Sequence, residues 1–165
     1  MPDFTLPAGL SLRPQTSTDA GFLATLFNAT HDYLRLIDGE ADFVEEIIEM
    51  QFRAQREGYG QQFPNAMYFI VEYHHEPIGR VAVDFGHAEV RLIDVAFIQA
   101  ARGRGYGTAV IRALQNAARK VAAPLTLTAL RHDRPVVELY AKLGFVIAAQ
   151  TEAHLLMAWS PVVSV

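Results

Sequence analysis

A glycine-rich segment with two arginines is the part of the sequence best suited to chemistry: Arg102-Gly103-Arg104-Gly105-Tyr106-Gly107-Thr108. It lies between an apolar stretch that ends near Ile98 and a stretch with helical periodicity. Glycines allow positive φ and a close approach to a ligand, and the first N–H groups of the following helix point outward with the positive end of its dipole. Arg102 and Arg104 add charge and paired donors. The segment is therefore predicted to bind phosphate.

Spacing argues against two common phosphate-binding loops. A P-loop has Lys and then Ser or Thr after its last glycine, whereas Gly107 is followed by Thr108 and Ala109. A dinucleotide fingerprint that begins at Gly103 needs another glycine at position 108 and an acidic residue about 20 positions later, where the chain has Thr126-Leu127-Thr128. The pattern that remains is Arg-x-x-Gly-x-Gly. An isolated Gly-x-Gly is also compatible with a tight turn between a strand and a helix.

Charge is unevenly distributed along the 165 residues. Residues 1–60 carry 4 basic and 10 acidic side chains, whereas residues 100–142 carry 8 basic and 2 acidic ones, in a chain of net charge −4. A basic block in an acidic protein favours a site for a small phosphorylated ligand, because the rest of the molecule would repel a polyphosphate. No nucleic-acid partner is expected.

Composition excludes several other classes. Hydrophobic residues make up 51% of the chain and charged residues 19%, which is typical of one globular domain, expected over residues 1–165. The absence of cysteine excludes disulfides, a thiolate nucleophile and Cys-ligated metals, and the six histidines lack metal-ligand spacing. We therefore expect no metal. There is no signal-peptide pattern and no apolar run near the roughly 20 residues that a bilayer requires, so no membrane partner and a cytoplasmic location are expected.

Hydrophobic periodicity predicts the elements that position the glycine-rich segment. In chain order they are a strand at 10–12 broken by Arg13-Pro14, a helix capped by 16–19 and running to about 33, a helix around 44–52 ending before Gly58-Tyr59-Gly60, strands at 67–73, 78–84 and 90–98, a helix at 110–121, a strand at 125–130, a helix at 135–143, and strands at 145–148 and 153–159. This order, β-α-α-β-β-β-α-β-α-β-β, predicts an α/β fold with helices against a mixed sheet.

The helix after the glycine-rich segment has a clear amphipathic pattern, which predicts that one face packs on the sheet. Its predicted apolar stripe is Val110, Ile111, Leu114, Ala117, Ala118 and Val121, and its predicted polar face is Arg112, Gln115, Asn116 and Arg119.

Two segments resemble the GNAT superfamily of acetyl-CoA-dependent N-acetyltransferases, in an uncharacterised branch. They are the run from Ile93 through Gly107 and Leu139-Tyr140-Ala141-Lys142-Leu143-Gly144-Phe145, which is similar to the family signature Leu-Tyr-x-Lys-x-Gly-Phe. The resemblance covers nearly the whole chain. It implies one GNAT-type domain of the α/β (α+β) class, with a mixed, mostly antiparallel sheet of about seven strands and about four helices. It also implies direct acetyl transfer from acetyl-CoA to a primary amine of a small molecule or peptide, by a monomer or homodimer.

The resemblance also implies roles for individual residues. The amides from Arg102 to Thr108, a run that includes Gly103, Arg104, Gly105, Tyr106 and Gly107, would hold the pyrophosphate of coenzyme A. The main chain of Val95 and Phe97 would pair with the pantetheine arm, and one amide there would polarise the acetyl carbonyl. Tyr140 would donate a proton to the departing thiolate, because its reference pKa of about 10 keeps it protonated at pH 7. A packed aromatic role for Tyr140 is the alternative.

Two positions depart from the family pattern. Asp133 lies seven residues before Tyr140, where the family often has an asparagine that faces the pantetheine, so this cofactor-binding position keeps acceptors but lacks an amide donor. Arg91 lies near the position of the family's glutamate base and cannot accept a proton at neutral pH. The missing glutamate favours an alternative function, a non-catalytic acyl-CoA-binding sensor or interaction module. An enzyme for longer acyl chains is a further possibility.

A proton acceptor is still expected, because an alkylammonium must lose a proton before it attacks a thioester. Asp94 is preferred because it interrupts an apolar strand, although a hydrogen-bonded structural carboxylate is the alternative. Glu89, Asp84 and His132 are the other candidates, directly or through water.

The acceptor site is expected around Tyr33 to Glu40 and Gln150 to His154, from the family resemblance. Asp38, Glu40 and the acidic N-terminal third would attract a cationic amine.

Overall fold

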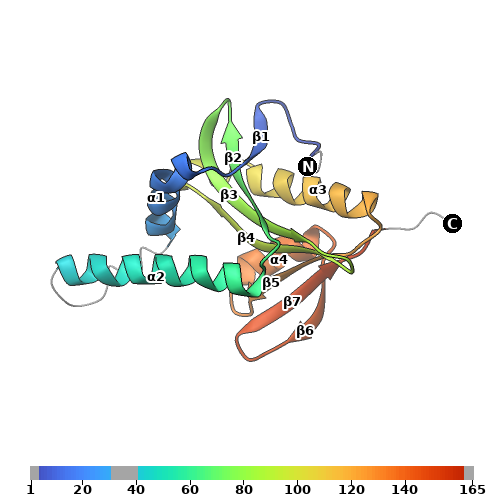
Figure 1. The fold of residues 1–165 in the computed structure, drawn as a ribbon. Helices are drawn as coiled ribbons and strands as arrows, with labels where there is room; N and C mark the ends of the chain where they lie inside the picture. The colour runs from blue at the N-terminus through green and yellow to red at the C-terminus, as the bar shows by residue number, and fades with distance from the viewer. Residues whose placement is uncertain (1–3, 31–40, 162–165) are drawn as a thin grey trace.

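The computed structural model describes residues 4–30 and 41–161 of the chain. In these ranges seven strands form one sheet in the order β1-β2-β3-β4-β5-β7-β6 (Figure 1). The strands are β1 (Leu10–Pro14), β2 (Met67–Tyr73), β3 (Glu76–Phe85), β4 (Val90–Phe97), β5 (Leu125–Leu130), β6 (Val146–Gln150) and β7 (His154–Trp159). The helices are α1 (Ala20–Thr30), α2 (Ala41–Gln62), α3 (Tyr106–Lys120) and α4 (Arg134–Lys142), with 3₁₀ turns at Ser17–Asp19 and Gln99–Ala101.

The predicted order of elements and the mostly antiparallel sheet are confirmed. Only β4 and β5 pair in parallel; the other neighbours in the described sheet are antiparallel. The helix between β4 and β5 provides the long crossover that a parallel pair requires.

Apolar side chains cover both faces of the sheet. On one face α3 buries Val110, Ile111 and Leu114 in a core shared with strand residues such as Val81 and Leu125. On the other side lie α1 and α2, and α1 contributes its own buried residues (Figure 1). Those residues are Leu23, Leu26 and Phe27. The central strands are therefore enclosed, and β1 and β6 form the two edges.

The α3 prediction is wrong at two positions. Gln115, expected on the polar face, is buried, and its Nε2 donates to the Leu143 carbonyl at 2.9 Å. This bond satisfies the buried side-chain amide of Gln115. It also gives a partner to the carbonyl of Leu143, the C-cap residue of α4, which has no acceptor role within that helix. Val121, expected in the apolar stripe, follows the end of α3 and is 61% exposed.

Two predicted boundaries are also wrong. α2 continues through Gly58 and Gly60 to Gln62, because each glycine inside a helix costs only about 1 kcal/mol relative to alanine. The helix ends two residues before Pro64, which disfavours helical geometry at the residue before it. β1 includes Arg13-Pro14, which was predicted to break it, and a proline is tolerated there because β1 is an edge strand.

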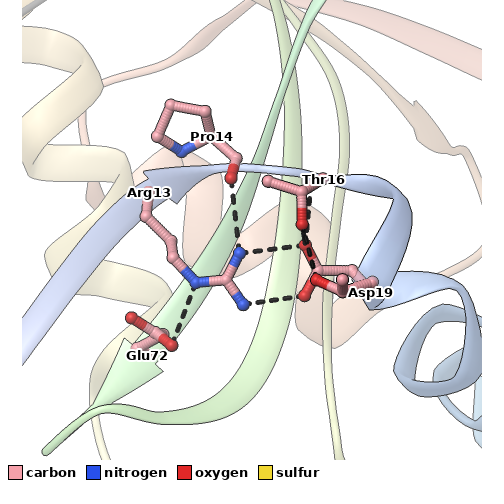
Figure 2. Close-up of polar contacts among 6 residues, drawn as sticks. Arg13, Pro14, Thr16, Asp19 and Glu72 are labelled. Carbon is pink, nitrogen blue, oxygen red and sulfur yellow. Dashed lines mark hydrogen bonds and ion pairs between the residues drawn. The ribbon is translucent and has the colours of Figure 1, made fainter.

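Arg13 is the centre of an ion-pair network that joins β1, β2 and the 3₁₀ turn before α1 (Figure 2). Its guanidinium donates to both carboxylate oxygens of Asp19 at 2.7 and 2.9 Å, and its Nε lies 3.0 Å from a Glu72 oxygen. The Thr16 amide also donates to Asp19, at 2.8 Å. The hydrogen bonds from Arg13 are the main reason that the pKa of Asp19 is lowered from 3.8 to about 2, despite burial.

Asp19→Asn should lower the free energy of unfolding by about 1 to 2 kcal/mol at pH 7. Because the folded-state pKa of Asp19 lies below its unfolded value, this stabilisation is complete above about pH 5 and is lost as the pH falls through about 2. Urea unfolding of wild type and variant over this pH range measures the difference. Glu49→Gln is the control, since Glu49 pairs with Arg53 on the surface and should contribute at most about 0.5 kcal/mol. A difference that stays constant on acidification would contradict the electrostatic explanation.

Candidate active site

β4 and β5 diverge within the sheet. They pair only over Val90–Leu92 and Leu125–Leu127. Beyond these residues β4 remains paired with β3 as far as Phe97, while β5 pairs with β7. A register shift between β3 and β4 makes Ile93 an extra residue, the signature of a bulge. The edge of β4 that faces away from β3 is therefore not paired with β5 over Asp94–Phe97.

A cavity of about 930 Å³ lies at this opening. Its walls come from the end of β4, the start of the glycine-rich loop, the N-terminal part of α4 and the facing sides of α1 and α2. The lining residues in the described part of the chain are Leu23, Leu26, Phe27, Thr30, Phe52, Gln55, Arg80, Asp94, Val95, Ala96, Phe97, Arg102, Gly103, Asp133, Pro135, Val136 and Leu139. Asp94 thus lines this cavity together with five of the predicted cofactor-binding residues, Val95, Phe97, Arg102, Gly103 and Asp133.

The glycine-rich loop has the backbone conformation that its sequence predicts. Gly103 and Gly105 have φ of 74° and 84°, in the left-handed region that favours glycine. A side chain at either position would meet no atom within 4 Å, so the space beside the loop is open. Gly105 is the N-cap of α3 and has no side chain to cap it, which leaves the first amides of the helix, Tyr106 to Thr108, available to a ligand.

The two arginines of the loop also stabilise its shape. Arg102 Nε donates to the Phe97 carbonyl at 3.2 Å, and Arg104 Nε donates to the Ala100 carbonyl at 3.1 Å. Arg102 lines the cavity, whereas Arg104 is exposed outside the described lining. Direct contact of either guanidinium with phosphate stays a prediction.

Gly79 is a residue that the sequence analysis missed. It pairs with Phe97 in the β3–β4 register, and a side chain at Gly79 would lie 2.5 Å from the Ala96 oxygen and 2.8 Å from the Phe97 ring. The ring is also 3.7 Å from where a side chain at Gly107 would begin. Gly79 thus leaves room for the end of β4. The signal available in the sequence was a glycine inside an apolar strand, which often marks a close approach of backbones.

Asp94 is hydrogen-bonded to Arg80, a second residue that the sequence analysis missed. The Arg80 side chain on β3 is buried and its Nη2 donates to Asp94 Oδ2. Both residues line the cavity. Arg80 and Asp94 share one sequence signal, because each is a charged residue within an apolar strand. Asp94 is therefore a structural partner of Arg80 and also a carboxylate in the cavity wall.

Tyr140 is half-buried on α4 and packs edge-on against Phe145 with 5.5 Å between ring centroids. Burial raises the pKa of its phenol above the ordinary value of 10.0, and the negative charges of Asp94 and Asp133 raise it further. The phenol thus interacts electrostatically with two carboxylates that line the cavity, although Tyr140 is not among the described lining residues. It remains protonated at neutral pH.

Asp133 lies at the N-cap of α4, where its side chain makes no capping hydrogen bond, and it lines the cavity. The other proposed bases lie elsewhere: Glu89 accepts a hydrogen bond from Thr126 at 2.6 Å, and Asp84 pairs in register with Arg91 at the opposite end of β4. His132 is exposed. Among the four carboxylate and imidazole candidates, Asp94 alone lines the described cavity.

The predicted acceptor segment from Tyr33 to Glu40 lies outside the described residues. The other segment, Gln150 to His154, forms an exposed turn in which the Thr151 amide donates to the His154 carbonyl at 2.9 Å. It does not line the described cavity.

The geometry suits an extended ligand that carries phosphate groups. An open strand edge offers main-chain partners to an extended arm, and the loop beside it offers positive charge, free helix amides and open space for phosphate. No cluster of three potential metal ligands occurs in the described ranges. No helix within them is long and apolar enough to cross a membrane.

Comparison with known proteins gives one family and many similar folds. The sequence profile of the Acetyltransferase (GNAT) family matches residues 29–145. No relative is found among curated protein sequences.

Three solved structures illustrate the likeness in fold. A PaiA N-acetyltransferase from Thermoplasma acidophilum in complex with coenzyme A is 12% identical (TM-score 0.68), with 92% of this chain and 99% of that one covered. An acetyltransferase from Thermus thermophilus is 18% identical (TM-score 0.68), with 95% and 100% covered. A GNAT family acetyltransferase from Elizabethkingia anophelis with acetyl-CoA bound is 13% identical (TM-score 0.60), with 94% and 100% covered.

Asp133→Asn should lower the pKa of Tyr140, because it removes a negative charge that opposes ionisation of the phenol. Alkaline NMR titration of protein with Cζ-labelled tyrosine measures this pKa, and Tyr140→Phe assigns the signal. Glu138→Gln, an exposed position on the same helix, is the control and should leave the pKa unchanged. An unchanged pKa in Asp133→Asn would mean that Asp133 does not act on the phenol.

Proposed function

Because the chain belongs to the GNAT family of acetyltransferases, we propose that it transfers an acetyl group from acetyl-CoA directly to a primary amine of a small molecule or peptide. One observation carries this proposal: the open edge of β4, the glycine-rich loop and Asp94 meet at one cavity. We assign this activity to a single domain over residues 1–165.

The main chain supplies most of the proposed coenzyme site. The amides from Arg102 to Thr108 receive the pyrophosphate at the N-terminus of α3, with Arg102 and Arg104 adding positive charge. The open edge of β4 at Val95 and Phe97 receives the pantetheine arm as an added strand. Asp133 offers an acceptor to an amide of that arm from the opposite wall.

The proposed chemistry needs three groups of this chain. Asp94 accepts the proton that the acceptor ammonium loses, directly or through a water molecule. A main-chain amide of β4 donates to the acetyl carbonyl oxygen as the amine nitrogen forms its bond to the carbonyl carbon. Tyr140 donates a hydrogen bond to the sulfur as the carbon–sulfur bond breaks. The amine nitrogen then loses its second proton to the thiolate, which leaves the coenzyme A thiol and an N-acetyl product. The chain has no cysteine to carry the acetyl group, which supports direct transfer.

Gly105→Glu should abolish coenzyme binding, because it places an anion where the pyrophosphate is expected. Calorimetric titration with coenzyme A and with acetyl-CoA should give a micromolar dissociation constant for the wild type. Gly105→Asn is the matched control, since asparagine tolerates the left-handed backbone and adds no charge, and it should weaken binding far less. Gly58→Glu adds the same charge on α2 and should have no effect. A wild type that binds neither ligand would refute the proposal.

Asp94→Asn should lower kcat by about 10²- to 10⁴-fold, and Tyr140→Phe by about 10²- to 10³-fold. Each should change the dissociation constant of coenzyme A by less than about threefold. Release of the coenzyme A thiol with a panel of amines measures turnover. The variants are compared at equal folded fraction, because Asp94→Asn also removes a carboxylate that accepts a hydrogen bond from Arg80. Asp84→Asn, at the far end of β3, is the control and should leave kcat unchanged. If the wild type binds acetyl-CoA but acetylates no amine, the chain is a sensor or interaction module.

A further inference from the structure

The helix that carries Tyr140 is anchored to the core at its C-terminal end. None of the nine residues of α4, all of which lie within the described ranges, is fully buried, and Tyr140 is only partly buried against the core. Leu143 and Phe145, which follow the helix directly, are buried in the cluster that also contains Leu114 of α3. The end of α4 that packs on α3 is therefore its most deeply held part.

Gln115 supplies the polar bond of this anchor. Its side chain on α3 is buried, and its Nε2 donates to the Leu143 carbonyl at 2.9 Å. Its Oε1 accepts a hydrogen bond from Arg112 Nη1 at 3.3 Å. Both ends of the side-chain amide thus have partners, which fixes its orientation. A buried polar group whose partners are complete specifies one arrangement of the elements that it joins, here α3 and α4.

The anchored segment is bonded to Tyr140 itself. The Leu143 amide donates to the Tyr140 carbonyl at 3.1 Å, and the Phe145 amide donates to the same carbonyl at 3.0 Å. The rings of Tyr140 and Phe145 pack edge-on with 5.5 Å between their centroids. The main chain and the ring of Tyr140 are therefore both tied to the segment that Gln115 holds.

The same helix carries the amides that we propose for the pyrophosphate. They lie in the first turn of α3, at Tyr106 to Thr108, and Gln115 follows Tyr106 by nine residues. At a rise of about 1.5 Å per residue this separation is about 14 Å. The residues between them include Val110, Ile111 and Leu114, which are buried against the sheet. One packed helix thus joins the proposed phosphate site to the anchor of α4.

We propose that Gln115 is a positioning residue that sets the place of Tyr140 relative to the α3 amides proposed for the pyrophosphate. This inference rests on the proposed function, in which Tyr140 donates a hydrogen bond to the thioester sulfur. Gln115 is not among the described lining residues of the cavity, so it acts through Leu143 and Tyr140 and not on the coenzyme. Loss of its bond to Leu143 weakens the donation to sulfur and leaves phosphate binding nearly unchanged.

A double-mutant cycle in turnover tests the proposal. Gln115→Met is close in size and removes both hydrogen bonds. It should lower kcat by about tenfold, because the phenol is displaced, while the dissociation constant of coenzyme A changes by less than about threefold. In the Tyr140→Phe background the same substitution should change kcat by less than about twofold, because the hydroxyl that Gln115 positions is already absent. An equal loss in both backgrounds would indicate a general structural role and would overturn the inference.

Two further variants keep the cycle interpretable. Asp19→Asn destabilises the protein through the Arg13 network and should leave kcat unchanged at equal folded fraction, so it controls for lost stability. Gln115→Glu keeps the shape and the acceptor for Arg112 but loses the donor to Leu143. It should lower kcat with the same dependence on Tyr140, and it provides the test if Gln115→Met does not fold.

Titration of the Tyr140 phenol gives a readout that needs no turnover. Release of α4 from α3 should expose the phenol, so the pKa of Tyr140 should fall toward 10.0 in Gln115→Met and stay unchanged in Asp19→Asn. Alkaline NMR titration of protein with Cζ-labelled tyrosine measures both values. An unchanged Tyr140 pKa in Gln115→Met would overturn the inference whether or not the protein acetylates an amine. If the wild type binds neither coenzyme A nor acetyl-CoA, the proposed function fails, and the pKa comparison still decides whether Gln115 positions Tyr140.

Discussion

Beyond Leu92, β4 keeps its hydrogen bonds to β3 while β5 pairs with β7, and the two parallel strands separate. Main-chain groups are obligatory hydrogen-bonding partners, so a strand edge that opens toward a cavity has to be satisfied by water or by a ligand. The bulge at Ile93 lies where the separation begins, and a bulge bends its strand and increases the local twist. The cavity, the exposed edge and the carboxylate of Asp94 are all consequences of this one departure from regular pairing.

The end of β4 needs support once it has left β5. Gly79 allows the β4 backbone and the Phe97 ring to approach β3 closely, and Arg102 binds the Phe97 carbonyl from the loop that follows. The first turn of α3 lies over the same ring at Gly107. The loop whose amides we propose for phosphate is therefore held by the strand whose edge we propose for the pantetheine arm, so the two halves of the proposed coenzyme site are positioned together.

Local sequence signals were sufficient for the elements and for the loop. Properties of a few adjacent residues account for the period of two over 67–73 and 90–98, for the Gly103 and Gly105 conformations, and for the end of α4 just before Gly144. Contacts between distant segments could not be read in this way. The Gln115 bond to Leu143 and the Arg80 bond to Asp94 each depend on which elements lie side by side.

The electrostatics of Tyr140 limit what it can contribute to acyl transfer. Burial and two neighbouring carboxylates, Asp94 and Asp133, raise its pKa above 10.0, so the phenol is a hydrogen-bond donor at neutral pH. The raised pKa makes the Tyr140 phenol a weaker acid. Complete transfer of its proton to the thiolate would be uphill, because the pKa of the corresponding thiol is lower. Hydrogen-bond donation to the sulfur needs no such transfer and is strongest when negative charge develops there. In the proposed reaction the two carboxylates therefore favour a tyrosine that stabilises the leaving group over one that gives up its proton.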